Sequence, residues 1–204
     1  MEDLRRHAPA TARNRDAILE VLRRHVQPGA RVLEIASGSG EHAVHLAPRL
    51  AVTSWQPTDP DPTSRTSIDA WRAEADPDRR VLPAIDLDVT GAWPAFSPAP
   101  DVIACINMIH ISPVAATEGL LDGAAALLGA GGLLYLYGPY RREGRHTAPS
   151  NEAFDASLRA RNPEWGVRDV EWVTSSAAAR GLSLVEIVPM PANNLSVVLA
   201  RVGV

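Results

Sequence analysis

The chain has 204 residues, of which 46% are hydrophobic and 22% are charged, and these values are typical of a folded, water-soluble protein. The formal net charge of −4 argues against a nucleic-acid-binding surface, which requires a basic stripe. The basic residues are all arginines, so a lysine Schiff base and a phosphate-binding lysine are excluded. We therefore expect no nucleic acid among the partners.

Cellular location is indicated by three further features of the sequence. The single cysteine, Cys105, lies in an apolar run and is expected to be a buried thiol. The first fifteen residues are polar and charged, which is unlike a signal peptide. Apolar runs stay shorter than the ~18 residues that a membrane span needs. We expect a cytoplasmic protein with no membrane contact.

The predicted elements alternate between helices and strands. Apolar residues at helical spacing predict an N-terminal helix over 11–26, ended by Pro28-Gly29. Strands are predicted at 31–36, 51–55, 81–87, 101–107 and 133–138, and helices at 41–50, 63–75, 112–128, 151–161 and 168–180. This β-α alternation predicts an α/β fold with a doubly wound, mostly parallel sheet. The runs 183–188 and 196–202 have a short connection, so they are expected to form an antiparallel hairpin. We expect a single domain over 1–204, with an inserted lid segment over 139–165.

The turn after the first strand carries the strongest functional signal. Gly38 and Gly40, flanked by Ala36, link an apolar strand to a helix, and such turns let a ligand approach bare backbone. Glu34 precedes this turn and Glu41 opens the helix, where two carboxylates would repel a pyrophosphate. They would suit a cationic nucleoside such as S-adenosylmethionine (SAM). A purely structural strand-turn-helix stays open as the alternative.

Further polar candidates follow the other strands, because ligands of open α/β sheets bind beyond the carboxyl ends of the strands. Asp59 is expected to bind ribose hydroxyls, with Asp61 as the second choice. The remaining candidates are Asp88 and Val89 at the adenine, Asn107 and His110 after the fourth strand, and Tyr140, Arg141, His146, Asn193 and Asn194 beside the substrate, together with Arg13 and Asn14 of the first helix. Each also has a plain structural reading as a turn, cap or surface residue.

A metal site is not expected. His42 and His45 are spaced to face one ligand on a helix, but no cysteine or carboxylate cluster completes a set, so we expect two helix-surface histidines. The segment after Tyr140 is long for a simple connection, and loops of that length often act as lids or binding loops.

Several strings in this chain resemble the family known as domain of unknown function 938, which includes the methyltransferase-like 26 proteins. They are Arg13-Asn14, Val32–His42, Trp55–Asp59, Asn107–Ser112, Tyr137–Tyr140, Ser150–Asp155 and Met190–Leu195. The resemblance covers nearly the whole chain. It implies a class I, Rossmann-like methyltransferase fold with a seven-stranded sheet whose last strand is antiparallel. It also implies SAM at the glycine turn, with Asp59 on the ribose and Asp88-Val89 at the adenine.

The resulting functional hypothesis is a SAM-dependent methyltransferase that acts on a small molecule, as a monomer or a homodimer. His110 is the first choice for a base or orienting group, and Tyr140 is the second. Three alternatives stay open. They are an enzyme that cyclises SAM and releases methylthioadenosine, a SAM-binding protein without activity, and a nicotinamide-linked oxidoreductase.

Overall fold

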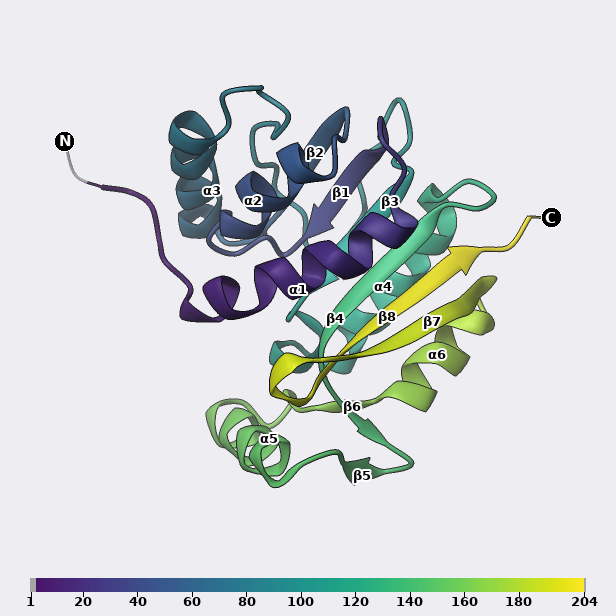
Figure 1. Cartoon of the computed structure of the whole chain (residues 1–204). Coiled ribbons are helices and arrows are strands. Elements are labelled where there is room, and N and C mark those ends of the chain that lie inside the picture. The colour runs from purple at the N-terminus through teal and green to yellow at the C-terminus, as the bar shows by residue number, and fades with distance from the viewer. Residues whose placement is uncertain (1–2, 204) are drawn as a thin grey trace. The chain divides into compact units, whose positions relative to one another are not determined.

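The computed structural model describes residues 3–203, and these residues fold into two compact units. The first unit runs to Asp88 and includes residues 93–104, and the second holds residues 89–92 and everything from Cys105 onward. Strand β3 (Val102–Ile106) begins in the first unit and ends in the second. Figure 1 shows the helices and strands of both units.

The first unit contains helices α1 (Pro9–His25), α2 (Glu41–Arg49) and α3 (Pro62–Ala75) and strands β1 (Arg31–Ile35) and β2 (Ser54–Pro57). Strands β1 and β2 pair in parallel, with Val32 opposite Trp55. Helices α2 and α3 lie side by side next to these strands (Figure 1). The core side of α1 is formed by Ile18, Leu19 and Leu22, which are at most 4% exposed. Burying each of them stabilises the fold by roughly 1.5–3 kcal/mol.

The predicted third strand, 81–87, is wrong in its extent. Only two isolated parallel bridges, Trp55 to Val81 and Thr58 to Ile85, join this segment to the chain around β2. Pro83 stands between the two bridges and has no amide N–H to donate, so it interrupts the ladder. Residues 89–101 then form no helix, in keeping with prolines at 94, 98 and 100.

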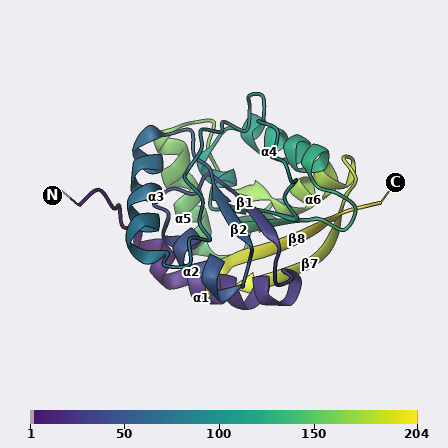
Figure 2. The same ribbon diagram turned by 90° about the horizontal axis from the view of Figure 1, so that it is seen from above.

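The second unit is built on strands β4 (Leu133–Arg142), β7 (Leu182–Met190) and β8 (Asn194–Arg201). Strand β8 is antiparallel to both β4 and β7, which confirms the predicted C-terminal hairpin. Helices α4 (Val114–Leu127) and α6 (Val170–Ala178) lie together on one face of these strands (Figure 2). The short strands β5 (Arg145–His146) and β6 (Arg168–Asp169) pair with the end of β4, and α5 (Pro149–Arg161) follows β5.

The strand order along the sheet is β2-β1-β3-β4-β8-β7. The fold is therefore the predicted α/β class with a mostly parallel sheet. Eight strands are assigned in residues 3–203 where seven were predicted, because β5 and β6 add two short strands and the segment at 81–87 is not one. None of the helices in this range is long and apolar enough to cross a membrane.

Candidate functional site

The glycine turn of the first unit lies between β1 and α2, and its backbone is partly left-handed. Ala36, Gly38 and Gly40 all have positive φ values, of 53°, 59° and 91°. A Cβ on Gly40 would lie 2.7 Å from the Cα of Ile68 in α3, so close packing of the helix requires glycine there. A Cβ on Gly38 would meet nothing within 4 Å. Gly38 therefore borders open space, as a ligand-binding turn requires.

Asp59 is tied directly to this turn. Its Oδ2 accepts a hydrogen bond of 2.9 Å from the amide of Gly38, and its Oδ1 accepts one of 3.0 Å from the amide of Asp61. Burial raises the pKa of Asp59 above its usual value. Asp61 instead caps α3, because its carboxylate accepts from the amides of Thr63 and Ser64. This division of roles favours Asp59 over Asp61 as a ligand group.

Glu34 proves to be a core residue. Its side chain is buried at the end of β1, and its Oε2 accepts a 2.9 Å hydrogen bond from the indole Nε1 of Trp55. Burial raises the pKa of Glu34 to about 7, although the bond from Trp55 opposes that rise. The raised pKa favours the uncharged form of this carboxyl. The repulsion of a pyrophosphate rests more on Glu41, whose Oε2 accepts from the amide of Ala8 and the hydroxyl of Ser39.

The two histidines of α2 are buried, so the expectation of helix-surface histidines is wrong. His42 Nε2 lies 2.9 Å from Oδ1 of Asn14, and His45 Nε2 lies 2.9 Å from Oδ1 of Asp16. Both contacts join α2 to α1, which packs over them. Burial lowers the pKa of His42 to about 3, so its ring is neutral and donates to Asn14. Arg13, by contrast, is exposed.

Asn14 therefore holds α1 on α2, while its predicted contact with a substrate stays a prediction. Groups of three or more histidine, cysteine or carboxylate side chains arranged for a metal are absent from residues 3–203.

In the second unit, Asn107 and His110 lie around Gly138 of β4. Asn107 has a φ of 64°, and His110 lies in a short helix, η1 (Ile109–Ile111). A Cβ on Gly138 would come within 3.0 Å of Nδ1 of His110 and 3.7 Å of Oδ1 of Asn107. Glycine at this position therefore gives the imidazole its space.

His110 is buried but its ring has no hydrogen-bond partner among the described residues. The ring packs edge-on against Phe154 of α5, with centroids 5.6 Å apart. Burial and the nearby Arg168 lower the pKa of His110 to about 4. The imidazole is thus neutral at physiological pH and can accept a hydrogen bond from a ligand.

Tyr140, Arg141 and His146 occupy the end of β4 and its hairpin with β5. The hydroxyl of Tyr140 is enclosed and has no hydrogen-bond partner among residues 3–203, and burial raises its pKa, so it stays protonated. Arg141 lies opposite His146 in the ladder, and its Nε is likewise enclosed without a partner. His146 Nε2 lies 3.4 Å from Oδ2 of Asp155. The loop predicted after Tyr140 is thus a strand extension with a tight turn at Glu143-Gly144.

The asparagine pair lies in the β7–β8 connection, within and after a second short helix, η2 (Pro191–Asn193). The carbonyl of Asn193 accepts from the side chain of Asn151, and its Nδ2 donates to the Ser150 hydroxyl. Asn194 donates to the carbonyl of Pro191. These bonds fasten the start of α5 to the turn, and the substrate contacts of both asparagines stay predictions.

The predicted adenine segment is divided between the units, since Asp88 ends the first and Val89 begins residues 89–92 of the second. Asp88 is exposed and Val89 is buried. A Cβ on Gly119 of α4 would lie 2.2 Å from the carbonyl oxygen of Val89, so this helix glycine lets the segment approach closely.

Sequence reasoning missed three residues that organise the second unit: Asn151, Asp155 and Arg168, all at most 9% exposed. Asn151 and Asp155 fall within the string Ser150–Asp155 that resembles the family, and nothing in that string marks them as buried. The sequence predicts Arg168 at the start of a helix, and its isolated charge gives no signal. The helical spacing of Asn151 and Asp155 was the available clue, since both lie on one face of α5.

Solved structures resemble this chain, and several of them are named as methyltransferases. They include the pyocyanin biosynthetic protein PhzM (18% identity, TM-score 0.73, covering 91% of this chain and 54% of that one). An O-methyltransferase family protein from Burkholderia thailandensis matches at 17% identity and a TM-score of 0.74, covering 93% of this chain and 60% of that one. The SAM-dependent methyltransferase SibL matches at 20% identity and 0.75, covering 95% and 56%. The chain thus spans little more than half the length of these proteins.

The fold is therefore that of the class I SAM-dependent methyltransferases. Within that class, residues 5–201 match the model of the family described as protein of unknown function (DUF938), and the chain belongs to this family.

Proposed function

We propose that this protein is a SAM-dependent methyltransferase that acts on a small molecule. The observation that carries the proposal is the open space beside Gly38, in a turn whose amide is held by a buried carboxylate, Asp59. This turn is part of a methyltransferase fold. Bound SAM would supply a methyl group activated by a sulfonium, and no covalent link to the protein is needed.

The glycine turn, Asp59 and the predicted adenine segment are proposed to hold SAM. The backbone at Ala36, Gly38 and Gly40 forms the turn, and Glu34 supports it from within the core. Asp59 already binds the turn through one lone pair of Oδ2, and a carboxylate oxygen can accept a second hydrogen bond, here from a ribose hydroxyl. Asp88 and Val89 are proposed at the adenine, with Asn107 of the second unit as a further contact.

Residues of the second unit are proposed to orient the methyl acceptor. His110 presents a neutral imidazole, which can accept a hydrogen bond from an O–H or N–H group. With a pKa near 4 it is a weak base, so positioning is its main proposed contribution. Tyr140 stays protonated and is proposed as a hydrogen-bond donor. Arg13, Asn14, Arg141, His146, Asn193 and Asn194 stay proposed as substrate contacts, and a cytoplasmic monomer or homodimer is proposed as the working form.

The test replaces Gly38 by arginine, which fills the open space. Calorimetry should show SAM binding by the native protein and at least a hundredfold weaker binding by Gly38→Arg. Gly131→Arg is the matched control, because Gly131 also has a positive φ, of 78°, and open space around it. Unchanged SAM affinity in Gly38→Arg would remove the turn from the proposed site.

Product analysis separates methyl transfer from other SAM chemistry. Incubation with a panel of small-molecule acceptors should release S-adenosylhomocysteine. Release of methylthioadenosine would instead indicate cyclisation of SAM, and binding without any product would indicate a protein that only binds it.

A further inference from the structure

Arg168 is a buried guanidinium whose charge is not neutralised by a carboxylate. The residue is 9% exposed, and ion pairs from it are absent among the described residues. Its Nη2 donates to two neutral backbone carbonyls, of Ser112 at 2.7 Å and Glu164 at 2.9 Å. Its Nε is enclosed and has no partner, and its Nη1 makes no hydrogen bond within residues 3–203. A buried charge in such surroundings costs free energy unless an anion accompanies it.

Two arginines and one carboxylate act on the charge of Arg168. Arg159 and Arg141 act on it with the same sign, and Asp155 is the carboxylate that opposes them. Asp155 is already engaged, because its oxygens accept from the amide of Val167 at 2.7 Å and from Nε of Arg159 at 3.2 Å. His146 also contacts it, at 3.4 Å. An added anion would therefore be attracted to this cluster.

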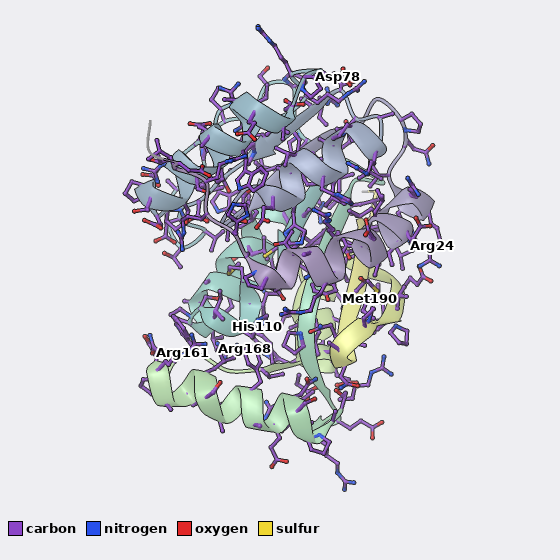
Figure 3. The ribbon with its side chains drawn as sticks, turned by 60° about the vertical axis from the view of Figure 1, so that its left-hand side comes forward. Arg24, Asp78, His110, Arg161, Arg168 and Met190 are labelled. Atoms are coloured by element: carbon purple, nitrogen blue, oxygen red, sulfur yellow. The ribbon has the colours of Figure 1, made fainter. Side chains whose placement is uncertain are left out.

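The neutral ring of His110 also lies near Arg168, and it packs on an apolar side chain. Figure 3 shows Arg168 next to His110, near α5. Arg168 is bonded to Ser112, two residues from His110, and the ring of His110 packs against Phe154. Phe154 is 38% exposed, although it is a large hydrophobic side chain. A ligand with an anionic end and an apolar body would neutralise the charge of Arg168 and cover the ring of Phe154.

We propose that Arg168 binds the carboxylate of an organic acid whose apolar body packs against Phe154, and that a separate hydroxyl or amine group of this acid is the methyl acceptor. In that step the S–CH3 bond of SAM would break, an O–CH3 or N–CH3 bond would form, S-adenosylhomocysteine would leave, and the proton of the O–H or N–H group would pass to water. Both N–H groups of Nη2 are already donated to carbonyls, so Nη1 is the donor left for a ligand, and its charge-assisted bond to a carboxylate is stronger than one to a neutral amide. The role of the acid as acceptor rests on the proposed methyltransferase function, whereas its binding does not.

The test measures the binding of three probes to the full chain by calorimetry: benzoate, benzamide and acetate. Benzoate should bind at least ten times more tightly than benzamide, which lacks the charge, and than acetate, which lacks the apolar body. Equal affinities for benzoate and benzamide would overturn the proposal.

Two variants assign the binding to these residues. Arg168→Met should lower benzoate affinity at least tenfold, and Arg168→Lys should recover part of it. Arg161→Met is the matched control, because Arg161 is an exposed arginine of α5 that stacks on Trp165. Phe154→Ala should weaken benzoate binding at least fivefold and leave acetate binding unchanged. Unchanged benzoate affinity in Arg168→Met, or an equal loss in Arg161→Met, would overturn the proposal.

If Arg168→Met fails to fold, as judged by circular dichroism, Arg168→Lys and Phe154→Ala decide the outcome. SAM binding is measured on the same samples. Loss of SAM binding with intact benzoate selectivity would contradict the methyltransferase function alone, and the reverse result would contradict the acid site alone.

Discussion

Two residues near the glycine turn have opposite responses to burial. Burial raises the pKa of Glu34 to about 7 and lowers that of His42 to about 3, because both side chains favour their neutral forms in the core. Each is held by one neutral partner, Trp55 for Glu34 and Asn14 for His42. Both residues therefore link the stability of the first unit to pH.

Replacing Glu34 by glutamine should remove part of the pH dependence of the unfolding free energy. In the folded protein the pKa of Glu34 is about 7, above its unfolded value of 4.5. The stabilisation that Glu34 contributes to the fold is therefore complete below pH 4.5 and is lost as the pH rises through 7. The unfolding free energy of the native protein should fall between pH 5 and pH 8. In Glu34→Gln this fall should be smaller by roughly 3 kcal/mol. Denaturant unfolding at both pH values measures this, with exposed Glu20→Gln as the control. An unchanged fall would mean that Glu34 is charged in the folded protein.

Replacing His110 by alanine should separate turnover from SAM binding. Turnover should fall at least tenfold while the SAM dissociation constant changes less than threefold, because His110 is proposed to orient the acceptor. In the native protein, activity should fall as the pH drops through about 4, because the ring of His110 becomes protonated there and can no longer accept a hydrogen bond. His110→Gln keeps an acceptor atom and should retain more turnover than alanine. Equal rates for native and His110→Ala would remove His110 from the mechanism.

At the scale of elements, glycines and prolines decide where helices and strands approach each other. Pro83 interrupts the pairing beside β2, and the prolines after Val89 prevent a helix there. Gly119 lies inside α4, where the absence of a Cβ lets the carbonyl of Val89 pack closely against the helix. Pro83 precedes the segment proposed to contact the adenine, the other prolines follow it, and Gly119 packs against it.

Replacing Gly119 by alanine should therefore destabilise the protein. Alanine in a helix interior is normally favoured over glycine by ~1 kcal/mol. Here its Cβ would lie 2.2 Å from a backbone oxygen, so we expect a net loss of about 2 kcal/mol or more. Urea unfolding measures the change, and Gly129→Ala, with open space around the position, is the control. A stabilised Gly119→Ala would show that the Val89 segment moves aside freely.

At the scale of the whole molecule, SAM should stabilise the folded chain by mass action. At a SAM concentration one hundred times its dissociation constant, the unfolding free energy should rise by about 2.7 kcal/mol. Hydrogen exchange should show added protection at Ser37–Gly40 but not at Gly131-Gly132. A thermal shift that persists in Gly38→Arg would place the ligand elsewhere.

The sequence alone determined the order and type of most elements, because the apolar periodicities and the turn glycines are local signals. It also located the glycine turn, whose positive φ values follow from residues within one short string. Tertiary structure decided which polar residues are buried and with whom they pair. Glu34 became a core residue, His42 and His45 turned inward, and Arg168 was left without a carboxylate. Burial and pairing depend on segments far apart in the chain, so the local pattern around these residues does not reveal them.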